Sequence, residues 1–515
     1  MKEVPMKHAP HYGRWTLVAA LAVALIGCSI PTKLERAQLR DDVPLAGLQT
    51  SARAGWPDAE WWRIYQDPQL DTLIALAMKQ SPDLAQAHSR VLNAEQSVRL
   101  TSAQMGLSIN GSAQVTRQRL SEHGLMPPAF LGFTWYNQAD LGVQFQYDFD
   151  WWGKKRASIE AALDQARSAE AQRSAAALTI QNAVADTYFG WQADQSRLTL
   201  AAQAVANQEK LVRIAELRVR QGVDLADTTQ QAKAQLAATR QLQVTIDSSG
   251  QIRKVALAAL LGIAPDQLPP LQPRALPEVR SGIPADARLD LIARRPDIAA
   301  SRWQVESALR QTDAARAQFF PDISITALVG LSSTNQGAPS LPGLSAGGGG
   351  GDLGNLFSSG SRVLSLTPAL HLPIFESGRL QANYGVSRAQ LDAAVAQYNG
   401  TVVNAAREVS SQALGAEQLV AQRKEQALQL AANERLLASA QARSRQGVRD
   451  AREGLAATAQ WLQQKDNAVS LHAQALSTDL SLIKALGGGY RLSSEAVDSS
   501  STHSSTTGDA DHERH

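Results

Sequence analysis

Residues 141–156 read LGVQFQYDFDWWGKKR, and this stretch decides the fold. Because the side chains of a strand alternate between its two faces, odd-numbered residues share one face and even-numbered residues share the other. One face is apolar and the other is polar: Leu141, Val143, Phe145, Tyr147 and Phe149 against Gly142, Gln144, Gln146, Asp148 and Asp150. Two tryptophans, a glycine and three cations then open a long run without proline. The pattern predicts a strand with one apolar face, followed by a helix.

Three further stretches alternate in the same way, which predicts four strands in two pairs. The expected strands are Ser108 to Arg119, Asn137 to Asp150, Ile323 to Ser333 and Arg362 to Phe375. The apolar faces of the last two hold Ile323, Ile325, Ala327, Val329 and Leu331, and then Leu364, Leu366, Leu370, Leu372 and Ile374. Each pair is joined by a connection longer than a two-residue turn.

The sequence contains an internal repeat. SPDLAQAHSRVLNAEQSVRLTSAQ begins at Ser81, and RPDIAASRWQVESALRQTDAARAQ, which begins at Arg295, aligns with it without a gap. Later, RQGV at residues 220–223 recurs at residues 445–448. A shared order of matching segments indicates an internal duplication, in which each half reads helix, two strands and two long helices. Pro82 and Pro296 fall at helix starts, where a missing N–H is tolerated.

Proline disappears after each strand pair: none lies between Pro128 and Pro265, and none follows Pro373. A helix from Lys154 to about Arg220 would be about 100 Å long at 1.5 Å per residue. Its apolar residues recur every seven positions, as in a coiled coil, at Val184, Trp191, Leu198, Val205, Val212 and Val219. Gly222 and Gly447 are the expected left-handed ends of the helices that precede the RQGV turns.

The N-terminus resembles a bacterial lipoprotein signal. Lys2, Lys7 and Arg14 precede an apolar run that is too short for a comfortable bilayer span. Leu25-Ile26-Gly27-Cys28 is similar to a lipobox, which implies cleavage before Cys28 and a covalent lipid there, N-palmitoyl and S-diacylglycerol. Ser29, in place of aspartate, favours the outer membrane. The alternative is a buried free cysteine in an uncleaved anchor.

Composition excludes several classes of protein. The 515 residues carry a formal charge of +2 and form no Lys/Arg block, so no nucleic-acid partner is expected. A single cysteine excludes an internal disulfide framework and a multi-cysteine metal site. The glycine run 347–351 lacks the Gly-Lys-Ser/Thr of a phosphate loop, and Ser481–Lys484 lacks the companion motifs of Ser-x-x-Lys enzymes. No nucleophile–base pair is evident, and we therefore expect neither an enzyme nor a cofactor or metal.

Lipid is the expected cover of the apolar strand faces. In a membrane, strands are stable only as a closed barrel, and their ends are flanked by aromatic residues. Such residues surround the quoted strand: Phe133, Trp135, Tyr136, Trp151 and Trp152. Four strands are too few to enclose a lumen, so several chains must join, as eight strands from a dimer or twelve from a trimer. A soluble β-sandwich fused to a coiled coil is the alternative.

The chain contains a set of short motifs in a specific order: Trp61-Trp62, YQDPQLD at residues 65–71, SPDL at 81–84, RPDI at 295–298, FFPDI at 319–323, LPIF at 372–375 and ALGGG at 485–489. This set resembles the outer-membrane factors, the TolC- and NodT-like lipoproteins of tripartite efflux systems. The resemblance implies a mixed α/β membrane protein that forms a homotrimer. A twelve-stranded transmembrane β-barrel in the outer membrane would be continued by a long α-helical periplasmic barrel.

The same resemblance implies partners and a function. The chain would dock to a periplasmic adaptor (membrane fusion) protein and an inner-membrane RND-type pump, and would act as a passive exit duct for drugs or other small amphiphiles. Two alternatives stay open: the duct of a type I protein secretion system, and a periplasmic coiled-coil scaffold without a pore. The expected domains are a signal peptide (1–27), a lipid-anchored segment (28–75), two repeats (76–275 and 276–490) and a disordered tail (491–515).

The turns that reverse the long helices are the expected periplasmic gate, because a channel needs a constriction that opens. Opposite charges on neighbouring hairpins would hold these tips shut. The candidate residues are Asp224, Asp227, Arg445, Arg449, Asp450, Arg452 and Glu453. An exposed ion pair contributes only about 0–1 kcal/mol, so several must act together. The alternative is that these are ordinary solvated turn charges. Residues 455–458 read LAAT, without the aspartate that this family often has there.

Overall fold

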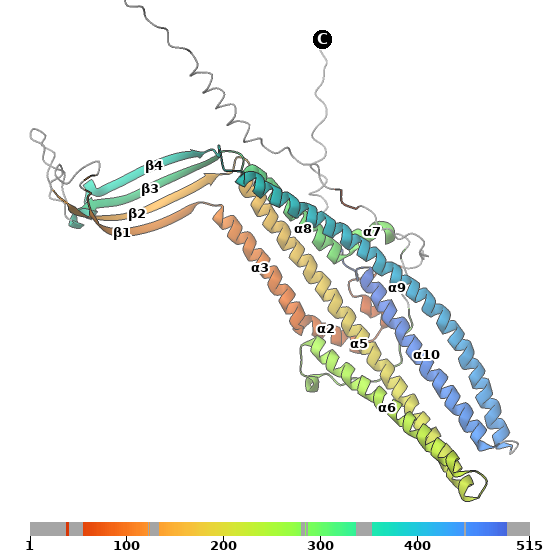
Figure 1. Cartoon of the computed structure of the whole chain (residues 1–515). Coiled ribbons are helices and arrows are strands. Elements are labelled where there is room, and N and C mark those ends of the chain that lie inside the picture. The colour runs from red at the N-terminus through yellow and green to blue at the C-terminus, as the bar shows by residue number, and fades with distance from the viewer. Residues whose placement is uncertain are drawn as a thin grey trace, which may run out of the picture. The chain divides into compact units, whose positions relative to one another are not determined.

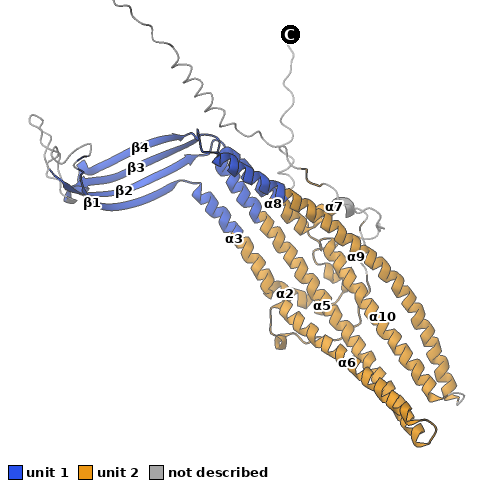
Figure 2. Cartoon of the chain, viewed as in Figure 1, with its two compact units in different colours: residues 1–37, 94–166, 305–394 blue, residues 38–93, 167–304, 395–515 orange. Residues whose placement is uncertain are grey.

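The computed structural model describes residues 38–40, 55–121, 123, 133–279, 284, 287–335, 353–446 and 450–491. These residues fall into two compact units, each assembled from separate stretches of the chain (Figure 2). Unit 1 comprises 94–166 and 305–394, and unit 2 comprises 38–93, 167–304 and the described part of 395–515. Each half of the chain therefore contributes to both units. The signal peptide, Cys28 and nearly all of the predicted tail lie outside the described residues.

Unit 1 contains a four-stranded antiparallel sheet in the order β1-β2-β3-β4 (Figure 1). The strands are β1 (Ser108–Arg119), β2 (Trp135–Phe149), β3 (Asp322–Thr334) and β4 (Arg362–His371). In the register, Val143 of β2 lies opposite Gly111 of β1 and Val329 of β3, and Val329 lies opposite Leu364 of β4. All four predicted strands are therefore present. Two short 3₁₀ turns, η3 (Leu353–Phe357) and η4 (Ser359–Ser361), precede β4.

The predicted end of the fourth strand was wrong. β4 ends at His371, so Leu372 and Ile374 lie beyond the strand and not on its apolar face. The ladder ends there because its partner β3 begins at Asp322, opposite His371, and Pro373 has no N–H with which to extend it.

The quoted strand ends where a helix cap begins. β2 stops at Phe149, and Asp150 accepts hydrogen bonds from the backbone N–H groups of Lys155 and Arg156 at 2.9 and 2.8 Å. These are two of the N–H groups that a helix start leaves without a backbone partner. The helix α5 (Lys154–Arg220) begins there, as predicted. Gly153, at φ +76°, takes the left-handed conformation that the sharp turn requires.

The order of elements is the same in the two halves of the chain (Figure 1). The first half contains α3 (Pro82–Gln104), β1, β2, α5 and α6 (Ala226–Leu261), and the second contains α8 (Pro296–Ala317), β3, β4, α9 (Arg379–Arg445) and α10 (Ala451–Ala485). Helices α5 and α9 have 67 residues each, and α6 and α10 have 36 and 35. The predicted helix starts at Pro82 and Pro296 are confirmed.

The core of unit 2 gathers around the segment after residue 55. Here η1 (Trp61–Tyr65) and α2 (Pro68–Gln80) pack with α5, α6 and α10, and the buried core includes Leu73, Ile74, Leu257 and Leu480. Two buried tyrosines tie this segment to the long helices. Tyr65 Oη donates to Asp479 Oδ2 and Tyr188 Oη to Asp67 Oδ2, both at 2.7 Å. Burial is the main cause that raises the pKa of both phenols, so both remain donors. The remaining short elements are η2 (Pro265–Gln267) and α7 (Ala287–Arg294).

Within unit 2, α5 contacts both α6 and α10. Arg253 of α6 pairs with Asp194 at 2.9 Å. On α10, Leu480, Asp466 and Leu455 meet Asn182, Arg197 and Asn207 of α5 in reverse chain order, so the two helices are antiparallel. The predicted seven-residue series is buried at Val184, Trp191 and Val212 and half-buried at its other positions. The regular spacing thus marks the inner face of the helix.

Candidate functional site

The sheet of unit 1 has one apolar face that runs across all four strands. Residues opposite each other in an antiparallel pair share a face, so the register defines this apolar face without ambiguity. It contains Ile109, Gly111, Ala113 and Val115 of β1, Ala139, Leu141, Val143, Phe145, Tyr147 and Phe149 of β2, Ile323, Ile325, Ala327, Val329 and Leu331 of β3, and Leu364, Leu366, Pro368 and Leu370 of β4. The opposite face is mostly Ser, Thr, Asn, Gln and Asp.

Much of the apolar face is exposed on the single chain. Val115 and Leu364 are exposed to 72% and 79%, and Leu366 and Leu370 to 66% and 68%. Soluble monomers rarely expose apolar patches of this extent, so the face marks a surface that another apolar phase covers. Of the helices that the structure describes, none combines the length and the apolarity that a bilayer crossing requires.

Aromatic residues lie at both ends of the apolar face. At the end near α5, Trp151 and Trp152 are exposed, and Trp152 stacks on Phe320 with ring centroids 4.6 Å apart. At the other end, Trp135 occupies the first position of β2 and is half exposed. Tyr136, which was predicted among these residues, lies instead on the polar face, where its Oη donates to Gln118. Because neighbouring side chains of a strand point to opposite faces, Trp135 and Tyr136 cannot share the apolar face.

The second candidate site joins the two helical turns of unit 2. Arg218, in the last turn of α5, donates to both carboxylate oxygens of Asp224, at 2.8 and 3.1 Å. Arg452, in the first turn of α10, donates to Asp450 at 2.8 Å. Two bonds cross between the turns, from Arg218 to Asp450 at 3.4 Å and from Arg452 to Asp224 at 3.2 Å. We call these four residues the tip network.

Both carboxylates of the tip network are held in the charged form. The Arg218 guanidinium lowers the pKa of Asp224 below its usual 3.8. The backbone N–H of Arg452 is the main cause that lowers the pKa of Asp450, which caps α10 through a 3.0 Å hydrogen bond from that group. Asp224 is the more enclosed of the two, since its side chain is 15% exposed and that of Asp450 is 38% exposed. The network therefore carries no net charge and is held together by ion pairs at neutral pH.

The structure brings together three of the predicted gate residues, Asp224, Asp450 and Arg452. Glu453 pairs instead with Arg443 of its own hairpin at 3.2 Å, and Arg445 donates to the carbonyl oxygen of Gln441. The remaining predicted positions take no part in the tip network that the structure describes, because Asp227 lies in the first turn of α6 and Arg449 and Cys28 fall outside the described residues.

Arg218 was missed in the prediction, although it contacts both turns. The turn after α5 places Asp224 next to Arg218. The N–H of Val223 donates to the carbonyl oxygen of Arg218 at 2.9 Å, and Gly222 is left-handed at φ +70°, as predicted. A sequence signal could have identified Arg218: it stands six residues before Asp224, with the glycine of the turn between them.

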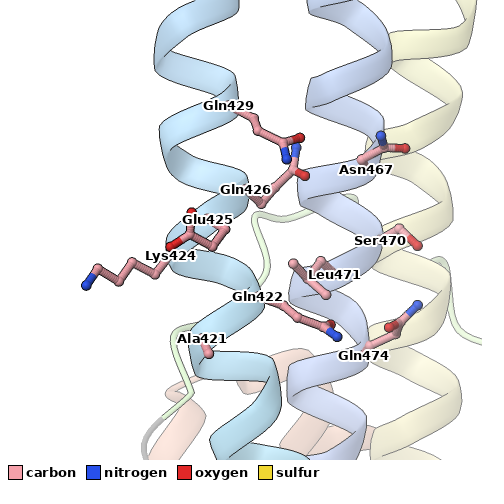
Figure 3. A pocket seen from close by; sticks show the side chains of 10 residues that line it. All are labelled: Ala421, Gln422, Lys424, Glu425, Gln426, Gln429, Asn467, Ser470, Leu471 and Gln474. Carbon is pink, nitrogen blue, oxygen red and sulfur yellow. The ribbon is translucent and has the colours of Figure 1, made fainter.

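A polar groove of about 720 Å³ opens between α9 and α10 in unit 2 (Figure 3). Gln422, Gln426 and Gln429 extend from α9 toward α10, whereas Lys424 points away. Gln426 Nε2 bridges the two helices by donating to the backbone and side-chain oxygens of Gln464, both at 3.0 Å.

The sequence matches a family described as "Outer membrane efflux protein" over residues 73–263 and 289–488. It is 31% identical over 466 residues to "Multidrug resistance outer membrane protein MdtP" of Escherichia coli (strain K12), which covers 89% of this chain and 91% of the relative. It is equally identical over 484 residues to "Multidrug resistance outer membrane protein MdtQ" of Escherichia coli O157:H7, with coverages of 92% and 97%.

A solved structure has the same fold. The crystal structure of the outer membrane protein VceC from Vibrio cholerae superposes with a TM-score of 0.73 at 32% sequence identity, and the match covers 85% of this chain and 100% of that one.

Proposed function

The chain belongs to the outer membrane efflux protein family, and from this premise we propose that it is the outer-membrane channel of a tripartite efflux system. It provides a passive exit for drugs and other small amphiphiles across the periplasm and the outer membrane. The two relatives compared above are multidrug resistance outer membrane proteins, which supports export of this class of compound. The channel itself performs no chemistry. The energy for transport comes from an inner-membrane partner.

The exposed apolar face of the four-stranded sheet carries the proposal. Within the described residues, the outer edges of β1 and β4 have no strand partner, and a membrane offers no hydrogen bonds to such edges. Four strands cannot enclose a lumen, so several copies must join edge to edge, as two copies with eight strands or three with twelve. The family resemblance implies three copies, and on that basis we propose a homotrimeric twelve-stranded barrel with the apolar face toward lipid and the polar face toward the lumen.

The long helices would continue this channel into the periplasm. Two hairpins per chain, α5–α6 and α9–α10, become six in a trimer and would form a helical tunnel of twelve helices. The matched lengths of α5 and α9, 67 residues each, support descent of the two halves from one duplicated unit. On this basis we keep the boundaries 76–275 and 276–490 for the two repeats, after the signal peptide and the anchored segment 28–75.

The tip network is proposed as the periplasmic gate. Its four side chains connect the two hairpin ends of one chain, and a symmetric trimer repeats the connection three times. The cognate partners would be a periplasmic adaptor and an inner-membrane RND-type pump, and contact with the adaptor at these tips would compete with the ion pairs. Asp227, Arg445 and Glu453 take no part in the tip network, and Arg449 lies outside the described residues; we propose these four as charges that contact the adaptor.

Cys28 is proposed as the lipid anchor, with N-palmitoyl and S-diacylglycerol groups as the covalent lipid. Its basic and apolar leader supports the proposal. Radioactive palmitate should label the wild-type chain, whereas Cys28→Ser should lose the label while Ser29→Ala keeps it. Persistent labelling of Cys28→Ser would refute the anchor.

Two alternative functions can be distinguished from the proposed one. A scaffold lipoprotein without a pore does not account for a sheet with one exposed apolar face. A protein secretion duct shares the architecture, and export of dyes or drugs separates it from an efflux channel.

The test of the proposed function combines three measurements on the full chain. We expect outer-membrane fractionation, trimer migration on gels that is lost on heating, and single-channel conductance in planar bilayers. Deletion of the gene should also raise accumulation of a fluorescent dye. A monomer without conductance would overturn the proposal.

A further inference from the structure

The apolar face carries a group of arginines at one end only. Arg117, Arg119 and Arg362 occupy positions of this face by register: Arg117 lies opposite Asn137, Arg119 opposite Trp135, and Arg362 opposite Leu331. All three are exposed. They lie where β1 and β3 end and where β2 and β4 begin, which is the end away from the long helices (Figure 1).

The charged residues of this face all have the same sign. Across the four described strands, its positions hold these three arginines and no Asp, Glu or Lys, whereas the acidic residues Asp140, Asp148 and Asp322 all have the parity of the polar face. A random scatter of solvated charges would place acids on both faces. This separation is the one that an anionic medium against the end of the apolar face would favour.

The arginines lie beside an aromatic residue of the type found at membrane interfaces. The Arg117 guanidinium is 5.3 Å from the centre of the Trp135 ring, so this side chain is directed along the apolar face and not toward the lumen. Tryptophan marks the depth of lipid headgroups, and arginine beside it lies at the level of their phosphates. A guanidinium also offers paired donors that match the oxygens of a phosphate.

Closure of the barrel would place the three arginines on two adjoining edge strands. Arg117 and Arg119 lie on edge strand β1 and Arg362 on edge strand β4, and neighbouring strands in a sheet are about 4.8 Å apart. In a ring of copies, β4 of one copy adjoins β1 of the next, so each boundary collects three cations on the lipid-facing side. We propose that Arg117, Arg119 and Arg362 form a binding site at each such boundary for the phosphate groups of anionic lipids in the outer leaflet.

This inference rests on the proposed function, and the experiment separates the two. The purified trimer is placed in mixed bilayers with equal amounts of phosphatidic acid and phosphatidylcholine. The lipids that remain bound after mild detergent extraction are counted by mass spectrometry. Trimer migration and conductance are measured on the same samples, so a monomer without conductance would count against the proposed function itself.

The variant is Arg117→Gln/Arg119→Gln/Arg362→Gln, and the matched control is Arg90→Gln/Arg99→Gln/Arg435→Gln, which removes three exposed arginines from helices. We expect the wild type and the control to enrich phosphatidic acid, and the variant to lose about tenfold of that enrichment while it still conducts. The triple Lys variant should retain part of it, because it keeps the charge but not the paired donors.

The inference would be overturned by no enrichment by the wild type, by equal enrichment by the Gln variant, or by an equal loss in the control. Inorganic phosphate is added as a competitor to distinguish the source of the phosphate. Displacement of lipid by free phosphate at matched concentration would mean an anion site that does not need a membrane, which would also overturn the lipid assignment.

Discussion

The guanidinium of Arg218 contacts the carboxylates of both Asp224, at 2.8 and 3.1 Å, and Asp450, at 3.4 Å. Arg218 thus joins two helical turns that are more than two hundred residues apart in sequence. Arg452 contacts the same two carboxylates from the other side, so the four groups form a closed cycle of alternating charge. Loss of one arginine leaves one crossing bond, and loss of both leaves none.

Arg218→Gln should therefore weaken the closed tip partially, and Arg218→Gln/Arg452→Gln should weaken it strongly. We expect single-channel conductance to rise modestly in the single variant and several-fold in the double variant. Arg220→Gln, two residues further along α5, is the control that removes a neighbouring charge outside the network. Equal conductance in the double variant and the wild type would exclude the network as the lock.

Asp450 and Glu453 should differ in effect although they lie three residues apart. Asp450 contacts the other turn, whereas Glu453 pairs within its own hairpin. Asp450→Asn keeps a good helix cap while it removes the charge, so any gain in conductance reports the ion pairs and not loss of the cap. We expect Asp450→Asn to raise conductance and Glu453→Gln to leave it unchanged, measured in the same planar bilayers. A larger effect of Glu453→Gln would reverse the assignment.

The closed tip should persist under moderate acid. The contacts lower the pKa of Asp224 and Asp450, so they stabilise the closed form above the ordinary carboxyl pKa of 3.8 and lose this effect as the pH falls through the lower values of the closed state. Conductance should stay constant from neutral pH to about one unit above 3.8 and rise only below it. A rise already near neutral pH would contradict the assignment of the lock to these two carboxylates.

Tyr65→Phe should destabilise unit 2. The variant removes the 2.7 Å hydrogen bond to Asp479, a carboxylate that is 2% exposed and that then lacks this donor. Loss of a donor to a buried acceptor costs about 1–3 kcal/mol, which thermal or chemical unfolding of the purified protein would detect. Tyr136→Phe is the control, because the hydroxyl of Tyr136 bonds Gln118 on an exposed strand. Similar unfolding of both variants would argue against a special role for the buried bond.

Gly487→Ala and Gly400→Ala should have opposite effects. Gly487 has φ +96°, and an added Cβ would collide with the backbone carbonyl of Arg294. Gly400 lies within α9 with open space around it, where alanine favours the helix by about 0.5–1 kcal/mol. We expect poor yield or a lowered unfolding temperature for Gly487→Ala and a small rise for Gly400→Ala. A tolerated Gly487→Ala would show that the close approach relaxes easily.

Local pattern was enough to predict most of the secondary structure. Period-two alternation located β1 at Ser108–Arg119, and proline-free composition located α5 at Lys154–Arg220, because both signals lie within the element itself. The end of β4 was missed because the alternation continues through Leu372 and Ile374, whereas pairing with β3 ends at His371. Pattern records which side chains are apolar, but the backbone decides where pairing stops.

The tip network was harder to predict than the strands. Asp224, Asp450 and Arg452 were found because turn charges are visible in sequence. Which of them meet depends on how two hairpins lie side by side, and Arg218 takes part only because the turn at Gly222 directs it back. Glu453 and Arg445 look equivalent to these residues in sequence and bond elsewhere. Contacts across long sequence separations therefore required the structure.

The antiparallel alignment of α5 with α10 constrains how homologous chains gain or lose residues. One inserted residue rotates the following part of a helix by about 100°, which would turn Asn207 away from Leu455 and Arg218 away from Asp450. An insertion of about seven residues completes two turns and restores the face, but it moves the following residues about 10 Å along the axis at 1.5 Å per residue. Only a matching insertion in α10 preserves both partners, so length variation in this region should come in paired steps.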